Sequence, residues 1–150
     1  MRLITRQPVA IAQIRGNKET AGLNGTVRFY QYPGGILTEV DVHGLPNNGM
    51  GFYGFHIHSG GSCSGNDFSS TGGHLNPTNT MHPYHAGDLP PLLSYNGRAY
   101  MAVMSDRFSL QDILGRTVVI HKMPDDFRSQ PAGNAGDKIA CGVIRRFGRK

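Results

Sequence analysis

The side chains that could do chemistry in this chain are six of its seven histidines and one aspartate. In chain order they are His56, His58, His74, His82, His85, Asp88 and His121. Three or four imidazoles suit copper, whereas imidazoles with one carboxylate suit zinc. Seven ligands fill two four-coordinate sites only if one of them serves both metals, and the central His74 is the natural bridge.

The first two histidines lie in a segment that alternates like a β-strand. Tyr53, Phe55 and Ile57 alternate with His56 and His58. A strand would bury the apolar set and project both imidazoles from the opposite face. The pattern therefore predicts a strand that carries two metal ligands on one side.

The remaining ligands must be brought to this strand by the fold. His121 closes a second strand-like segment, Thr117 to His121, whose β-branched residues favour a strand. Only a folded barrel or sandwich brings it close to His58. The segment 72–88 is rich in Gly, Pro, Asn and Thr and carries the other ligands. Loops this long without secondary structure are uncommon unless they have a function.

Short strands separated by turn residues are expected along the whole chain. The 150 residues fit one domain, 1–150, and the 21 glycines and 9 prolines indicate many turns. The expected strands are Val9 to Arg15, Gly25 to Tyr32, Ile36 to His43, Phe52 to His58, Arg98 to Met104, Arg116 to Lys122 and Lys138 to Arg146. The one expected helix is a short turn around Ser109 to Leu114. This pattern predicts an all-β sandwich or barrel.

The third expected strand has a clean alternation. Val40 and Val42 are expected to face the core, and Glu39 and Asp41 to face outward.

Five blocks of sequence resemble the copper/zinc superoxide dismutase family, in the right order and over nearly the whole chain. They are Gly54–His58 (GFHIH), Gly73–Pro77 (GHLNP), His85–Leu89 (HAGDL), Gly115–His121 (GRTVVIH) and Gly133–Ile144 (GNAGDKIACGVI). The resemblance implies a flattened Greek-key β-barrel, which is an immunoglobulin-like sandwich, with long metal-binding and electrostatic loops.

The resemblance also implies a role for each candidate residue. The copper ligands are His56, His58, His74 and His121, and the zinc ligands are His74, His82, His85 and Asp88. Asp125 is the carboxylate that links one ligand of each metal, because a metal-bound imidazole is usually oriented through its free N–H. Only two residues separate His82 from His85, so the zinc loop is compressed relative to the family.

Lys138 stands where the family has an arginine. A positive charge at the mouth of the site speeds the capture of a small anion. Lysine keeps that charge but loses the planar fork of a guanidinium. The predicted catalytic residues are therefore Lys138, which guides the substrate, and His74, which returns a proton. The loop between His121 and Lys138 is also shorter than in the eukaryotic enzymes.

The two cysteines admit two interpretations. Cys63 follows the first histidine strand and Cys141 lies in the last expected strand. Taken alone, they favour two free buried thiols, because disulfides are rare in a reducing cytosol. The family resemblance implies instead a disulfide between them. Such a bond stabilises the fold by about 4 to 5 kcal/mol in the chain-entropy model.

The resemblance implies a superoxide dismutase that disproportionates superoxide to dioxygen and hydrogen peroxide. Copper cycles between Cu(II) and Cu(I), and a structural zinc shares the bridging histidine. The alternative is a superoxide dismutase-like copper/zinc-binding protein with weak or no activity, which stores or delivers copper. A third class is a zinc-stabilised structural domain that needs no copper site.

Other functions have little support in the sequence. The net charge of +5 and the basic tail Arg145 to Lys150 come with no nucleic-acid recognition motif. No segment is apolar and long enough for a membrane span. The seventh histidine, His43, matches no metal ligand of the family. No signal-peptide core is seen, which predicts a cytoplasmic protein, or a secreted or periplasmic one if a leader was removed. Expected partners are superoxide, a second copy of the chain and a copper chaperone.

Overall fold

The computed structural model of the protein describes residues 3–148. Its elements are β1 (Ala10–Gly16), β2 (Asn24–Tyr32), β3 (Gly35–His43), β4 (Phe52–Tyr53), β5 (Phe55–His58), a 3-10 turn η1 (Ser69–Thr71), β6 (Leu92–Leu93), β7 (Arg98–Ser105), α1 (Leu110–Ile113), β8 (Thr117–His121) and β9 (Lys138–Arg146). Six of the seven expected strands match β1, β2, β3, β7, β8 and β9 to within one residue at each end. The expected helical turn is α1, which Ser109 caps through its side chain.

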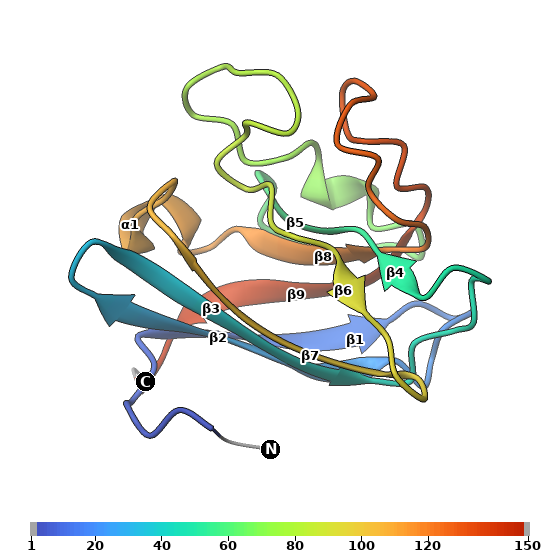
Figure 1. Ribbon diagram of the computed structural model, residues 1–150, viewed down its shortest axis with the longest axis horizontal. Helices are drawn as coiled ribbons and strands as arrows, with labels where there is room; N and C mark the ends of the chain where they lie inside the picture. Colours follow the sequence, from blue (N-terminus) through green and yellow to red (C-terminus); the bar gives the residue numbers. More distant parts are fainter. Residues whose placement is uncertain (1–2, 149–150) are drawn as a thin grey trace.

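Seven strands form one antiparallel sheet in the order β5-β8-β9-β1-β2-β3-β7. The sheet curls so that β5, β8 and β9 form a layer above β1, β2, β3 and β7 (Figure 1). The chain crosses from β3, the last strand but one of this order, to β5 at its other end, and crosses back between β7 and β8. These crossovers fit a Greek key, so the predicted all-β, flattened barrel is confirmed.

The hydrophobic core lies between the two layers. Val27, Phe29 and Val40 of the lower layer and Phe55 and Ile120 of the upper layer are fully buried in one cluster. Each of these positions alternates along its strand with a residue that faces the other way, which is the period that a strand imposes. The two layers therefore form a packed base under the long loops that follow β5 and β8 (Figure 1).

The expectation of one strand over Phe52 to His58 is wrong, because Gly54 interrupts it. The Gly54 N–H donates to the carbonyl of Met123 at 2.9 Å, and its own carbonyl accepts from the His121 N–H at 2.8 Å. A Cβ atom at this position would lie only 2.7 Å from Cβ of Ala135. Close contact with the loop after β8 thus separates β4, which pairs with β6 in a second small sheet, from β5.

Glu39 lies on the face of β3 that points away from the core, as expected. Its side chain is nevertheless fully buried and not exposed to solvent. The hydroxyl of Tyr30 donates to Oε1 at 2.9 Å and that of Tyr100 donates to Oε2 at 2.7 Å. Arg28 lies 4.0 Å from the same carboxylate. The tyrosines on the neighbouring strands cover the acid, which an alternation pattern within one strand cannot reveal.

This network predicts that the stability difference between the parent and a Tyr100→Phe variant depends on pH. Burial and the Glu39 carboxylate raise the pKa of Tyr100 to about 12. The neutral phenol is therefore favoured by folding, and its contribution is complete below the unfolded pKa near 10 and is lost as the pH rises through about 12. Tyr100→Phe should destabilise the fold by about 1 to 2 kcal/mol at pH 8. Urea unfolding of both proteins at pH 8 and at higher pH measures whether this difference shrinks; a constant difference would contradict the assignment.

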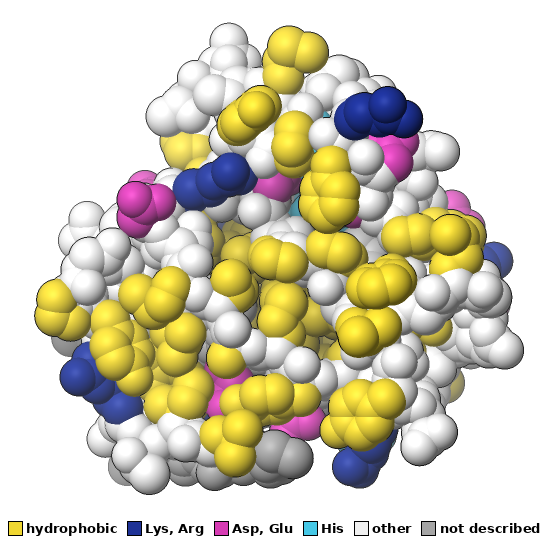
Figure 2. Space-filling model, viewed as in Figure 1, with side chains coloured by type: hydrophobic (Ala, Val, Ile, Leu, Met, Phe, Trp, Pro, Cys, Tyr) yellow, Lys and Arg dark blue, Asp and Glu magenta, His cyan; other side chains and the backbone are white. Residues whose placement is uncertain are grey.

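The face of the molecule in Figure 2 is largely apolar around β4 and β6. Phe52 and Leu93 are cross-strand partners, and they are exposed together with Met50 and Tyr95. The segments 42–66 and 89–97 contain no Lys, Arg, Asp or Glu. Exposed apolar clusters without charge are a feature of surfaces that bind another protein, which bears on the predicted homodimer. Within residues 3–148, none of the helices has the length and apolar character needed to cross a membrane.

Candidate metal centre

The loop after β5 runs back along that strand and so places its ligands. The Ile57 N–H donates to the carbonyl of Gly87, and the Ile57 carbonyl accepts from the Leu75 N–H. These bonds set His58 opposite His74 and His56 opposite Asp88 in two isolated bridges. Gly87 is needed for this approach, because a Cβ there would lie 2.2 Å from the Ile57 carbonyl oxygen. Strand pairing thus brings loop residues to the histidine face of β5.

The structure brings all the sequence-predicted ligands into two groups that share one residue. The first group is His56, His58, His74 and His121, and the second is His74, His82, His85 and Asp88. Within each group the ligand atoms lie within 4.8 Å of one another. Every histidine of the two groups is buried, while His43 is exposed and belongs to neither.

In the first group, hydrogen bonds fix which nitrogen of each ring carries the proton. His58 donates from Nδ1 to the carbonyl of Gly72 at 2.8 Å, and His121 donates from Nδ1 to the carbonyl of Gly136 at 3.2 Å. His56 donates from Nε2 to Asp125 at 2.8 Å. The other nitrogen of each ring therefore presents a lone pair. The two Nε2 atoms of His58 and His121 face each other at only 3.2 Å.

Two facing lone pairs need a cation between or beside them, and a proton is a poor candidate here. Burial, followed by repulsion from His121, lowers the pKa of His58 to about 2. Burial, followed by repulsion from His56, lowers the pKa of His121 to about 3. Both rings are therefore neutral at physiological pH. The first group fits a metal ion that prefers imidazole nitrogen.

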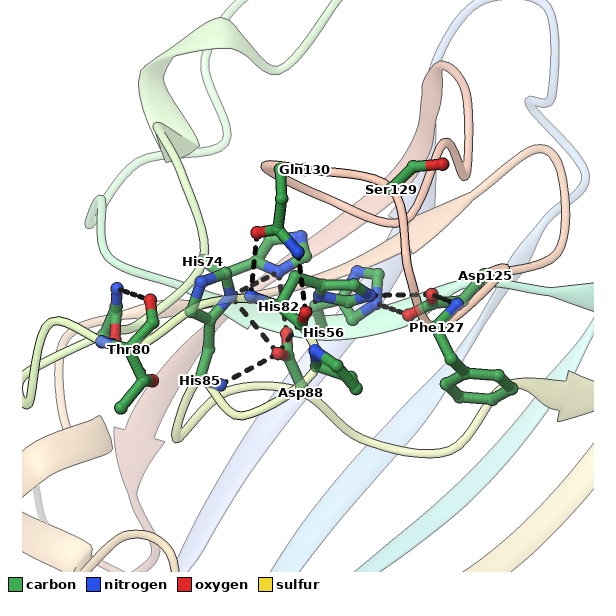
Figure 3. Close-up of polar contacts among 12 residues, drawn as sticks. His56, His74, Thr80, His82, His85, Asp88, Asp125, Phe127, Ser129 and Gln130 are labelled. Atoms are coloured by element: carbon green, nitrogen blue, oxygen red, sulfur yellow. Dashed lines mark hydrogen bonds and ion pairs between the residues drawn. The ribbon is translucent and has the colours of Figure 1, made fainter.

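The second group contains a carboxylate and is arranged around Asp88 (Figure 3). Asp88 lies 2.7 Å from Nδ1 of His74, 3.1 Å from Nδ1 of His82 and 3.2 Å from Nδ1 of His85. Burial works against the charged form of Asp88, but the surrounding histidines more than offset it and lower its pKa. Three imidazoles and one carboxylate are a ligand set typical of zinc.

His74 belongs to both groups through its two nitrogens. Nδ1 faces Asp88 and His85 in the second group, at 2.7 and 3.2 Å. Nε2 is buried without a hydrogen-bond partner among the described residues, as are Nδ1 of His56 and Nδ1 of His82. Buried polar nitrogens without partners are costly and call for a ligand. The compressed loop between His82 and His85 therefore still delivers a complete ligand set.

Asp125 lies between the two groups and contacts one histidine of each. Its Oδ2 accepts from Nε2 of His56 at 2.8 Å, and its Oδ1 accepts from Nε2 of His82 at 2.7 Å (Figure 3). Burial disfavours the charged carboxylate, but these two bonds and the Phe127 N–H lower its pKa below the usual range. The carboxylate thus fixes the tautomer of both rings, and it lies between the two groups as the family resemblance implies.

A cleft of about 650 Å³ opens onto the first group. It is lined by His58, His74 and His121, by Lys138 and by residues of the segment 129–136. The Lys138 ammonium donates to Oγ1 of Thr71 at 2.7 Å and to the carbonyl of Gly72 at 2.9 Å. Burial lowers the pKa of Lys138, and Asp67 partly offsets this effect. Since an ammonium has three N–H donors, these contacts leave one for an anion in the cleft.

Cys63 and Cys141 form the disulfide that the family resemblance implies, so the interpretation as free thiols is wrong. The bond ties the loop after β5 to β9 and packs in a small buried cluster with Phe68 and Val119. Lys138 of the same strand reaches the same loop at Thr71. Two separate contacts from β9 thus hold the loop beside the cleft.

Several residues that support the site were not found by sequence reasoning. Among them are Thr71 and Gly72, which accept the Lys138 bonds, and Gln130, which contacts the backbone of His82. A hydroxyl, a backbone carbonyl and an exposed amide have no residue-type signature of metal chemistry. Only their spatial position reveals them.

Comparison with known proteins agrees with this geometry. The family model described as copper/zinc superoxide dismutase matches residues 23–144. A Cu-Zn superoxide dismutase of Legionella pneumophila is 40% identical over 129 residues, covering 81% of this chain and 77% of the relative. One of Aquifex aeolicus is 37% identical over 136 residues, covering 81% of this chain and 78% of the relative.

Two solved structures extend the comparison to the fold. A double mutant of a SOD-like protein from Bacillus subtilis superposes with a TM-score of 0.81 at 31% identity, covering 90% of this chain and 96% of the other. The Cu/Zn superoxide dismutase from Brucella abortus gives a TM-score of 0.76 at 29% identity, covering 89% and 98%. With the match over most of its length and with both histidine groups in place, the chain belongs to the copper/zinc superoxide dismutase family.

Proposed function

We propose that the protein is a superoxide dismutase that binds copper in the first histidine group and zinc in the second. The observation that carries the proposal is the convergence of unprotonated imidazole nitrogens of His56, His58 and His121 with a nitrogen of His74, beside a cleft that Lys138 also lines. Copper supplies one-electron redox chemistry when bound, and zinc supplies a fixed positive charge.

The residues of the chain supply binding, orientation and a proton. Lys138 attracts superoxide into the cleft and offers it a hydrogen bond. Gly72, Gly136 and Asp125 hold the imidazoles in the tautomers that expose the lone pairs. His74 carries a proton in one half of the cycle and gives it to the reduced substrate in the other. The overall reaction takes two superoxide anions and two protons to one dioxygen and one hydrogen peroxide.

The test of the function is metal analysis together with a superoxide-decay assay on the reconstituted protein. The expected result is about one copper and one zinc per chain with rapid decay of superoxide. Both metals with slow decay would favour the alternative, a copper/zinc-binding protein that stores or delivers copper. That alternative is relevant because a structural relative is itself described as SOD-like. Zinc alone would favour the structural domain.

Lys138 variants test how the substrate is attracted. Lys138→Arg should keep or raise activity, because a guanidinium keeps the charge and adds a second parallel donor. Lys138→Met keeps the stem without the charge and should lower kcat/KM. Lys138→Glu should lower it by about 10-fold or more, because the attraction becomes repulsion. Copper content should be the same in all variants, because Lys138 is not a ligand.

The salt dependence separates guidance from packing. The Debye length falls from about 10 Å at 0.1 M to about 3 Å at 1 M, so salt should slow the parent and speed Lys138→Glu. Equal activity of the parent, methionine and glutamate proteins at low salt would show that Lys138 does not guide the substrate.

A homodimer, a copper chaperone and a cytoplasmic location are predictions that we retain as part of this proposal. The uncharged apolar surface around β4 and β6 supports the first of them (Figure 2).

A further inference from the structure

The loop 122–137 forms hydrogen bonds to both the ring and the backbone of His82. The carboxylate of Asp125 binds the ring. The second contact comes from the side-chain amide of Gln130. Its Oε1 accepts from the His82 backbone N–H at 2.9 Å, and its Nε2 donates to the His82 backbone carbonyl at 2.7 Å. The amide therefore pairs with the backbone of His82 as a neighbouring strand would (Figure 3).

This pairing replaces secondary structure that the ligand loop lacks. Loop residues 76–91 contain no strand or helix in the structure. Asn76 holds Thr80 in the same manner, accepting from the Thr80 N–H at 2.9 Å and donating to the Thr80 carbonyl at 2.9 Å. Asn76 belongs to the same loop as its partner, whereas Gln130 belongs to another loop. Gln130 therefore joins two loops that carry different parts of the site.

The segment that contains Gln130 also lines the cleft, as Lys138 does, and so forms part of its wall. Gly133 packs directly on the contact between Asp125 and His82, since a Cβ there would lie 2.1 Å from Oδ1 of Asp125. The Gly133 N–H donates to the carbonyl of Ser129 at 2.7 Å. The segment 129–136 thus contacts the backbone of His82 through Gln130 and the ring of His82 through Gly133, beside Asp125. Both contacts together set its position.

We propose that Gln130 is a positioning residue that couples the zinc group to the wall of the copper cleft. It fixes the backbone of His82, so that the ring meets Asp125 and Asp88 at the same time. In return, a bound metal at His82 holds the segment 129–136 in place. The inference rests on the proposed function, because it takes the second group to be the zinc site.

The test compares Gln130→Ala and Gln130→Glu with Gln111→Ala, which removes an exposed glutamine of α1 that belongs to neither histidine group and does not line the cleft. Gln130→Glu has the shape of the parent side chain and keeps an acceptor for the His82 N–H. It replaces the donor with an oxygen that faces the His82 carbonyl oxygen. Both Gln130 variants should therefore differ from the parent, and Gln111→Ala should not.

Three readouts are taken on protein loaded with zinc, or with cobalt(II) in its place. Zinc release to a chromogenic chelator should be about 10-fold faster in Gln130→Ala, the effect typical of losing a partner that supports a ligand. The visible absorption bands of cobalt(II) should shift, because the His82 ring is held less firmly. Amide hydrogen exchange in residues 126–136 should be faster than in the parent.

The outcomes distinguish the inference from the proposed function. If the parent binds zinc and cobalt, but Gln130→Ala shows the parent's release rate, spectrum and exchange, then the role of Gln130 is wrong and the zinc site stands. If the parent binds neither metal, the zinc assignment itself is wrong, and so is the proposed coupling between the zinc group and the cleft wall. Faster exchange without any change in the cobalt spectrum or the zinc release would reduce Gln130 to a loop contact and would also overturn the proposal.

Discussion

His74→Ala is expected to uncouple the two metal groups and to abolish most of the superoxide-decay activity. His74 is the one residue that the groups share, with Nδ1 facing Asp88 and a buried Nε2 facing the other histidines. An imidazole that offers a lone pair on both nitrogens is stable only between two cations, so its loss weakens both sites. Zinc affinity should fall by more than the roughly 10- to 100-fold that loss of an outer partner costs.

The measurement is zinc affinity and the visible spectrum of bound copper, each taken with and without the other metal. In the parent, zinc should change the copper spectrum, and in His74→Ala it should not. His43→Ala is the matched control, because His43 is exposed and lies outside both groups. If the variant keeps the parent copper spectrum and zinc affinity, the bridge assignment is wrong.

Loss of the disulfide between Cys63 and Cys141 is expected to cause the largest fall in stability. The bond closes a segment with a sequence separation of 78. In the chain-entropy model such a closure contributes about 4 to 5 kcal/mol. For a chain of this size that corresponds to a fall in Tm of roughly 10 to 20 °C. The loop after β5 would then be held to β9 mainly by the contact of Lys138 with Thr71 and Gly72.

The experiment uses metal-free protein, because bound metal stabilises the fold by mass action and would mask the difference. Tm is measured by circular dichroism in oxidised and reduced protein, with free thiols counted in each. The variant with both Cys63→Ser and Cys141→Ser is the control, and a reductant should not change its Tm. Two titrating thiols in the oxidised parent, or an unchanged Tm on reduction, would contradict the disulfide.

Local sequence patterns predicted most strand positions because a strand's alternation is set by its own residues. Lys138–Arg146 was predicted with its exact bounds, and the buried face of Phe55 and Ile57 followed from period two. The patterns failed where another segment decides the outcome. Gly54 ends β4 because the loop after β8 packs against it, and β6 exists as a strand because it pairs with β4.

The burial of Glu39 has the same explanation. Its own strand alternates cleanly, so the pattern correctly gives the face on which it lies. That face is covered by Tyr30 and Tyr100, which come from other strands. A charged residue is buried there because two hydroxyls on neighbouring strands offer it hydrogen bonds, and sequence spacing contains no information on such pairs.

The candidate ligands were found from sequence because metal chemistry restricts residue type. Few side chains offer imidazole or carboxylate ligands, so candidate metal-binding residues can be identified from the sequence alone. Their grouping into two sets, and the closing of Cys63 with Cys141, came from the family resemblance and not from spacing.

What only the tertiary structure decided is how the ligands are held. The tautomers of His58 and His121 depend on the carbonyls of Gly72 and Gly136, which lie 14 and 15 positions further along the chain and meet the rings only because the loops fold back. Gln130 reaches His82 across 48 positions. Any residue has a backbone carbonyl and many have a polar side chain, so residue type marks none of these supports. The sequence therefore determined which side chains can bind metal, and the packing of the loops on the curled sheet determined which nitrogen of each ring faces the site.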